Sequence, residues 1–336
     1  MSVVRRGALL RTVAAAALAI TFSVSLAAQW PSWPTPDVPR KDGKPILDGP
    51  APRHPDGKVD LSGLWGLGGF GGGGGAGGRG RGAGAPNQPA PPPDPNAIPN
   101  SAFFEVAGRG DRVPLQPWAA ALKRERMADN NKDNPDVWCL PIGIMQYHNH
   151  PQPGHIVQTK HLTLMTWESN YGLRYVYTDG RPAPNNDPTP FWFGYSRGWY
   201  EGNDVFVVET TNFLADERAG WHDVNGTPYT DALKMTERYR RPTFGTMQID
   251  VTIEDPKALT RPFTVRVNKR LQVDTDVIEF ICNENERSTH HIDPPAWMKG
   301  EPPRQLGPDM LLKSGIRAAD APPPPPPAAP AAPPAK

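Results

Sequence analysis

Two carboxylates are the first candidates for chemistry, because each interrupts the apolar face of a predicted strand. In the run 205–211, Glu209 shares a strand face with two valines. In the run 233–240, Glu237 shares a face with a leucine and a methionine. A charge on such a face is costly unless it pairs with a cation or lines a wet cavity. The pattern therefore indicates a ligand pocket or a buried ion pair, with partly solvated strand ends as the alternative. In a shared pocket, burial and mutual repulsion would raise one pKa, so the two carboxylates could act as general acid and base.

A long connection at 212–229 supplies a third candidate, His222. The connection separates two predicted strands and also carries Trp221. Loops of this length inside compact domains are usually functional or disordered, and the adjacent tryptophan and histidine argue against disorder. We expect the connection to form a loop at the rim of a ligand site, where His222 could move a proton.

Two histidines, His148 and His150, have a spacing that could bind metal. Two residues apart, they place both imidazoles on one face of an extended segment, and two such rings with a carboxylate could hold a divalent metal. Pro151 and Pro153 interrupt the segment, and no His-x-x-Glu-His motif is present. A hydrogen-bonding histidine cluster is the alternative, and no other cofactor is expected.

Aromatic residues are plentiful in the predicted strands and the adjoining loops. Such rings stack on sugars and on planar apolar ligands, although they more often fill a core. An aromatic cavity would suit a small-molecule ligand. The residues predicted to bind it are Tyr175, Tyr177, Trp199, Trp221 and Tyr239.

Apolar and polar residues alternate with a period of two through most of the region 101–312, which is typical of strands buried on one face. Helical periodicity is confined to 118–129. Short turns such as Asp179-Gly180 separate the runs, so we expect successive hairpins. The predicted fold is therefore all-β: an antiparallel meander forming a closed or nearly closed barrel, preceded by one helix. The runs lie at 156–167, 173–178, 199–211, 233–240, 247–253, 263–271 and 277–282.

Composition marks two segments that cannot build a core. Gly-rich and then Pro-rich residues fill 67–100, and Pro and Ala dominate the end of the chain after 313. We expect both to be disordered spacers, which could hold the protein near the cell envelope or the cell wall. The predicted organisation is a signal peptide at 1–27, an extended segment at 28–58, a first strand at 59–66, the disordered insert at 67–100, the barrel domain at 101–312 and the disordered tail at 313–336.

The N-terminus predicts export. Arg5 and Arg6 precede an apolar run that ends in small residues at Ala27, which is the order of a secretory signal peptide. We therefore expect a periplasmic or secreted protein in which Cys139 and Cys282 form a disulfide. Lys and Arg number 36 against 35 Asp and Glu, so nucleic acid is not an expected partner. No membrane span is expected, because no apolar run reaches the length of one.

The stretch 55–65, PDGKVDLSGLW, resembles the opening signature of a large set of secreted, mostly uncharacterised proteins from environmental bacteria. This chain departs from that pattern in its long Gly/Pro insert after Trp65. The resemblance implies secretion and names no activity. It continues at Cys139-Leu140-Pro141-Ile142-Gly143, Tyr177-Thr178-Asp179-Gly180, Trp199-Tyr200-Glu201-Gly202-Asn203, Thr236-Glu237-Arg238-Tyr239 and Cys282-Asn283-Glu284-Asn285.

A shorter stretch, Gly63-Leu64-Trp65, resembles the Gly-x-Trp that opens the first strand of lipocalins, which are small barrels that hold an apolar ligand. That resemblance implies an arginine packed on Trp65, and Arg287 is the candidate. Three functional hypotheses follow. The protein binds a small apolar or glycan-like ligand; it is a hydrolase, lyase or isomerase that uses carboxylate or histidine acid-base chemistry; or it is a structural, envelope-associated protein.

Overall fold

The computed structural model describes residues 33–67, 113–184, 189–284 and 286–323. The chain divides into two compact units. The smaller unit joins 33–38 to 273–276, where the Thr35 amide donates to the Asp274 carboxylate at 2.9 Å. The larger unit contains the barrel. The predicted signal peptide at 1–27, the insert from 68 onward and the tail beyond 323 lie outside the described residues.

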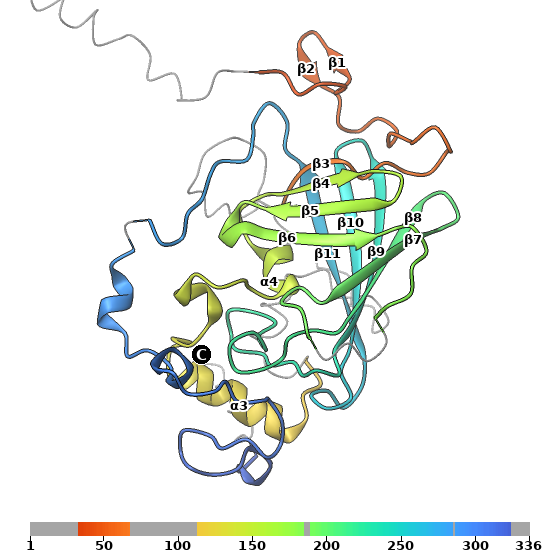
Figure 1. Cartoon of the computed structure of the whole chain (residues 1–336). Coiled ribbons are helices and arrows are strands. Elements are labelled where there is room, and N and C mark those ends of the chain that lie inside the picture. The colour runs from red at the N-terminus through yellow and green to blue at the C-terminus, as the bar shows by residue number, and fades with distance from the viewer. Residues whose placement is uncertain (1–32, 68–112, 185–188, 285, 324–336) are drawn as a thin grey trace, which may run out of the picture. The chain divides into compact units, whose positions relative to one another are not determined.

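The barrel predicted from the sequence is confirmed. Within the described residues, nine strands close in the order β10, β11, β3, β4, β5, β6, β7, β8, β9 (Figure 1). A separate two-stranded sheet of β1 (Arg40–Lys41) and β2 (Lys44–Pro45) precedes them. The barrel strands are β3 (Gly63–Leu67), β4 (Gly154–Gln158), β5 (Leu162–Trp167), β6 (Gly172–Tyr177), β7 (Tyr195–Glu201), β8 (Val205–Thr211), β9 (Lys234–Thr243), β10 (Thr246–Glu254) and β11 (Phe263–Leu271).

The strand order departs from a pure meander at one described junction. There β6 and β7 run parallel, with Val176 opposite Ser196, whereas the other barrel pairs are antiparallel. Parallel neighbours need a long connection, and the chain between these two strands is long enough to return to the same end of the barrel. The predicted strand at 277–282 is absent from the described structure, which has no strand there.

The predicted helix is present as α3 (Pro117–Ala128), while a second helix, α4 (Ile144–Asn149), was not predicted. Every residue of α4 is buried, so the segment lacks the polar face that reveals a helix in a sequence. Among the described helices, none is both long and apolar enough to cross a membrane. The short 3-10 helices are η1 (Pro135–Trp138), η2 (Ser169–Tyr171), η3 (Ser288–His291), η4 (Ala296–Lys299) and η5 (Ala318–Asp320).

The predicted boundary of the disordered tail is wrong. Ala318, in η5, is buried in a small core with Trp118 and Leu122 of α3. The amide of Lys313 also donates to the Glu125 carboxylate of the same helix at 2.5 Å. The chain at 313–321 therefore contacts α3 before the proline run begins, and Ala318 is its buried apolar residue there.

The predicted disulfide is confirmed. Cys139 and Cys282 are bonded, with their Cα atoms 5.5 Å apart and a sequence separation of 143 residues. In the chain-entropy account, closing so long a loop stabilises the fold by roughly 4 to 5 kcal/mol. The bond ties the segment before α4 to the segment after β11.

Candidate functional site

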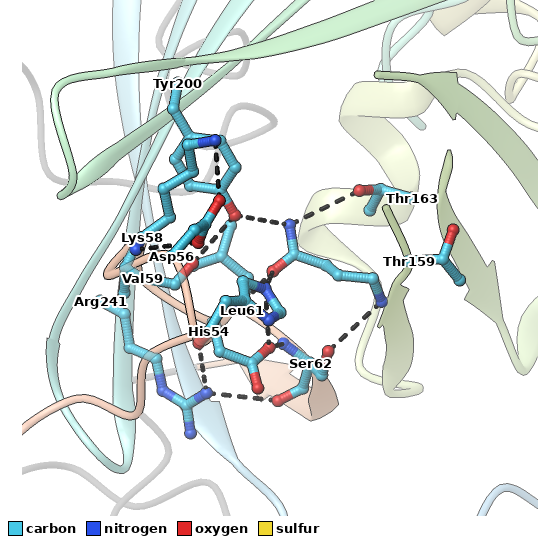
Figure 2. Close-up of polar contacts among 12 residues, drawn as sticks. His54, Asp56, Lys58, Val59, Leu61, Ser62, Thr159, Thr163, Tyr200 and Arg241 are labelled. Atoms are coloured by element: carbon cyan, nitrogen blue, oxygen red, sulfur yellow. Dashed lines mark hydrogen bonds and ion pairs between the residues drawn. The ribbon is translucent and has the colours of Figure 1, made fainter. Parts of the chain in front are cut away.

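The signature at 55–65 takes part in a polar cluster with the side chain of Gln158, at the end of β4. Figure 2 shows Val59 and Leu61 of the signature beside Tyr200 in this cluster. The side-chain oxygen Oε1 of Gln158 accepts from the Leu61 backbone amide at 2.7 Å, and the side-chain nitrogen Nε2 donates to the Tyr200 hydroxyl at 3.1 Å. That hydroxyl donates in turn to the Val59 carbonyl at 2.9 Å. Val59 and Leu61 are buried, so the signature anchors the chain against β4 and β7. Its role in this structure is to position β3.

Trp65 does have an arginine against its ring, but it is Arg241 rather than Arg287. The guanidinium of Arg241 lies 4.8 Å from the centre of the Trp65 ring, whereas Arg287 is exposed. Arg241 also donates to the Asp60 carbonyl at 2.7 Å. The expectation for Arg287 is wrong because the chain after β11 does not form another barrel strand in the described structure.

Inside the barrel, Glu237 forms a buried ion pair, which is one of the alternatives that its position left open. Its partner is Arg174 of β6, and each of the two guanidinium nitrogens Nη1 and Nη2 donates to one carboxylate oxygen. Tyr239 donates its hydroxyl to Glu237 Oε1 at 2.7 Å. Burial opposes ionisation of Glu237, but the Arg174 and His148 side chains outweigh it and hold its pKa well below the usual range. Glu237 is therefore an ionised, fully paired group.

The remaining donors of Arg174 are also satisfied. Its Nε donates to the Ser196 hydroxyl at 2.9 Å, and Nη2 donates to the Thr210 hydroxyl at 2.5 Å. Those two hydroxyls lie 2.9 Å apart. Although burial alone would lower the pKa of Arg174, Glu237 raises it above its ordinary value. The network from β6 through β9 thus has its charges neutralised internally.

His148, at the end of α4, connects this network to a pocket. Burial lowers its pKa despite the neighbouring Glu237, so the ring is neutral at neutral pH. Its Nε2 therefore carries the proton and donates to Glu237 Oε1 at 2.7 Å. Within the described residues, Nδ1 makes no hydrogen bond, and the ring lines the pocket. This orientation leaves an unprotonated nitrogen available to accept a proton.

The pocket lies within the barrel and has mostly apolar walls. It has room for little more than one water molecule. Tyr147 of α4 stacks on Trp167 at 4.8 Å between ring centres and so braces one wall. A side chain at Gly172 would place its Cβ 2.8 Å from Tyr147, so only glycine leaves room for that stack. The apolar and aromatic lining includes Trp65, Met165, Trp167, Tyr239, Met247 and Ile249.

Lys269 of β11 is another titratable group at the pocket. It is only 4% exposed, and no hydrogen bond or ion pair to its amine occurs among the described residues. Burial alone lowers its pKa to about 7. Lys269 and His148 therefore face one small apolar space as a poised amine and a neutral imidazole.

Glu209 does not share this interior. It lies on the outer face of β8, where it pairs with Arg197 at 2.6 Å and Lys234 at 3.3 Å. Val205 and Val207 lie on the same outer face as Glu209. The prediction that these three residues share a face is therefore correct, but the prediction that this face points into the barrel is wrong. The hypothesis that Glu209 and Glu237 act as one acid-base pair is wrong.

His222 and Trp221 lie away from the pocket, in a loop that packs on α3. The Arg126 guanidinium of α3 stacks 3.8 Å from the centre of the Trp221 ring. The His222 ring packs against Tyr229 at 4.9 Å between centres, and burial lowers its pKa to about 3. The loop 212–229 is ordered, as expected, but neither residue lines the pocket. The loop contacts α3 through Trp221 and through the Gly220 and Gly226 carbonyls, which accept hydrogen bonds from Arg126.

The predicted aromatic ligand contacts divide between two faces. Tyr239 lines the pocket, whereas Tyr175 and Trp199 are 47% and 42% exposed on the outside of β6 and β7. Tyr177 stacks on Tyr195 at 5.2 Å, also away from the pocket. Four of the five predicted contacts, counting Trp221 with these three, therefore do not belong to the interior site.

His148 and His150 contact different side chains in the structure. Helix α4 ends between them, so His148 reaches Glu237 while His150 Nδ1 contacts the Gln152 side chain. The prediction of an extended segment at these histidines is wrong, so they do not share the strand face that it implied. In the described part of the chain, no group of three or more His, Cys, Asp or Glu side chains is arranged to hold a metal ion.

The prediction omitted Lys269 and Arg174, although the sequence contains a signal for both. Lys269 follows Phe263, Val265 and Val267 on one strand face, the same pattern that drew attention to Glu237.

Comparisons of the chain with known protein families, with curated proteins and with solved structures found no match. The site therefore has to be interpreted from its own geometry.

Proposed function

We propose that the barrel binds a small, largely apolar molecule whose carboxylate or carbonyl oxygen accepts a hydrogen bond from Lys269. The observation that carries this proposal is the buried amine of Lys269, which has no partner in the described residues. An unpaired buried amine is costly, and a ligand oxygen would remove that cost.

The pocket walls suit such a ligand. Trp65 and Trp167 offer flat apolar surfaces, and Met165 and Met247 are flexible side chains that can move aside. The empty space is smaller than a typical ligand site, so binding is expected to displace these methionines. A compact ligand is favoured over an extended glycan for the same reason.

Tryptophan fluorescence tests this function, because Trp65 and Trp167 are at the pocket. Benzoate, a small planar carboxylate, should change the emission of the protein in a saturable way. Lys269→Met should weaken benzoate binding by about tenfold or more, as expected for loss of a charge-assisted hydrogen bond. The matched control is Lys160→Met at an exposed lysine, which should leave affinity unchanged. Equal affinity in the Lys269 and Lys160 variants would overturn the proposal.

A second candidate, an acid-base enzyme of the lyase or isomerase type, is favoured by the orientation of His148. Glu237 holds one ring nitrogen, so the other can act as a general base in the pocket. Levulinate in deuterated water offers a test, since removal of a proton beside its ketone is visible by NMR. Catalysed exchange that His148→Asn abolishes, with levulinate still bound, would favour the enzyme. Binding without exchange would favour the binder.

We also propose that the protein works outside the cytoplasm, in the periplasm or as a secreted protein. The signal-like order at 1–27 and the Cys139–Cys282 disulfide both support export. Cell fractionation and N-terminal sequencing test this: a mature chain starting near Ala28 in the periplasm or medium is expected. A full-length chain in the cytoplasm would contradict it, and retention in the envelope fraction would favour the structural hypothesis.

A further inference from the structure

We propose that Lys269 reacts covalently with small aldehydes and ketones, forming an imine inside the barrel. This inference rests on the proposed function, because it requires that small molecules enter the pocket. It goes further by assigning the ligand class as carbonyl compounds and by assigning the amine as the nucleophile.

The surroundings of Lys269 distinguish it from a structural lysine. It lies opposite Met247 in the ladder between β10 and β11, among apolar side chains. No carboxylate pairs with it in the described part of the chain, although Glu237 lies in the same barrel and is occupied by Arg174. A paired carboxylate would hold the proton on the amine and block attack on a carbonyl.

The protonation state agrees with this geometry. With a pKa of about 7, a large fraction of Lys269 is the neutral amine at neutral pH. An exposed lysine is almost entirely protonated under the same conditions. The other titratable groups that line the pocket are His148, His155 and Tyr239. Burial lowers the pKa of His148 and raises that of Tyr239, so these two are neutral at neutral pH.

The reaction can be written with groups present at the pocket. The Nζ lone pair of Lys269 attacks the carbonyl carbon, a C–N bond forms, and the carbonyl π electrons move to oxygen. His148 Nδ1 accepts a proton from the nitrogen and returns it to the oxygen, which gives a carbinolamine. Loss of water breaks the C–O bond and leaves the imine, so one carbonyl and one amine yield one imine and one water.

The apolar walls favour the product. Imines hydrolyse in water, and the pocket admits little water beside the amine. Glu237 keeps the proton of His148 on Nε2, so that Nδ1 is available for the transfer. Glu237 and Arg174 are accordingly positioning residues for this reaction.

Reductive trapping tests the inference. The folded protein is treated with acetaldehyde and sodium cyanoborohydride at pH 7, and alkylation of each lysine is followed by peptide mass spectrometry. Lys269 should be labelled about tenfold or more faster than exposed Lys160, despite its burial. Lys123 provides an internal control: burial lowers the pKa of its amine as well, but Asp223 opposes that shift and Lys123 does not line the pocket, so it should react more slowly than Lys269.

Two further readouts separate chemistry from simple access. The rate at Lys269 should level off above about pH 8, whereas the rate at exposed lysines should continue to rise toward pH 10. His148→Asn should slow the labelling of Lys269 by about tenfold or more while Lys160 is unaffected.

The outcomes distinguish this inference from the function on which it rests. Labelling of Lys269 no faster than that of Lys160 overturns imine formation, and if benzoate still binds through Lys269, the ligand-binding function stands. Failure of both benzoate binding and labelling overturns both. Preferential labelling with the levelled pH profile supports both.

Discussion

Two basic side chains, Arg174 and Lys269, are buried within one barrel, and their surroundings are opposite. Arg174 has a carboxylate and two hydroxyls on its guanidinium, whereas Lys269 has no partner in the described residues. Glu237 raises the pKa of Arg174, while burial alone lowers that of Lys269 to about 7. The charge of Arg174 is neutralised by Glu237, whereas the amine of Lys269 remains available to a ligand.

The difference suggests which group stabilises the fold and which serves a ligand. Removing one member of a buried pair leaves the other charge buried and uncompensated, so the stability of the fold requires Arg174 and Glu237 together. Removing an unpaired amine relieves a cost instead. A residue that lowers stability yet occupies a pocket is a candidate for function.

The largest effect is expected from Glu237→Gln, which leaves Arg174 buried without a counter-charge. We expect a loss of about 3 to 5 kcal/mol in the free energy of unfolding, measured by urea denaturation followed by circular dichroism. Replacing both partners, Arg174→Met with Glu237→Leu, should cost less than the single change, because no charge then remains unpaired. A double variant as unstable as the two single changes summed would contradict the pairing.

Lys269→Met should change stability in the opposite direction, by about 1 to 4 kcal/mol near pH 7. The pKa of the amine is about 7 in the folded state and higher when unfolded, so the unfolded chain binds more protons between those values. Wild-type stability from this group therefore rises with pH across that window. The gain from Lys269→Met should shrink by about 2 kcal/mol between pH 7 and pH 9.

Urea denaturation of wild type and variant at both pH values measures this gain, and their difference removes the contributions of other titrating groups. A gain that is the same at pH 7 and pH 9 would show that Lys269 titrates normally. The comparison with Arg174 would then fail.

The smallest effect is expected from Glu209→Gln on the outer face. Glu209 pairs with Arg197 and Lys234 where water screens both contacts, so the change should cost less than about 1 kcal/mol. The effect should diminish further in high salt. A loss as large as that of Glu237→Gln would mean that the two carboxylates are not as different as their positions indicate.

Period-two patterns predicted the barrel and the interior position of Glu237, because side-chain alternation is a local property of strands. The disulfide followed from cysteine count and predicted compartment. The mistake at Glu209 shows the limit of the method: two valines precede it, yet their face is the outer one, and Val207 is buried there all the same. A strand can be apolar on both sides.

The pocket itself depended on contacts that no local pattern contains. Helix α4 is too short and too buried to show helical periodicity, so the partnership of His148 with Glu237, 89 residues later, was not predictable. The interior arginine and lysine could have been found by applying the argument used for Glu237 to cations as well. Their opposite circumstances could not, since pairing is decided by the closed sheet.

The disulfide has a consequence for how the barrel is held shut. Strands β4 to β11 lie between Cys139 and Cys282, so among the described barrel strands only β3 lies outside the covalent loop. β3 is held by three residue pairs to β11 and three to β4, and it carries Trp65 beside the strand of Lys269. Local separation of β3 from β4 and β11 would thus open an entrance to the pocket beside the amine of Lys269, while the strands inside the disulfide loop kept their arrangement.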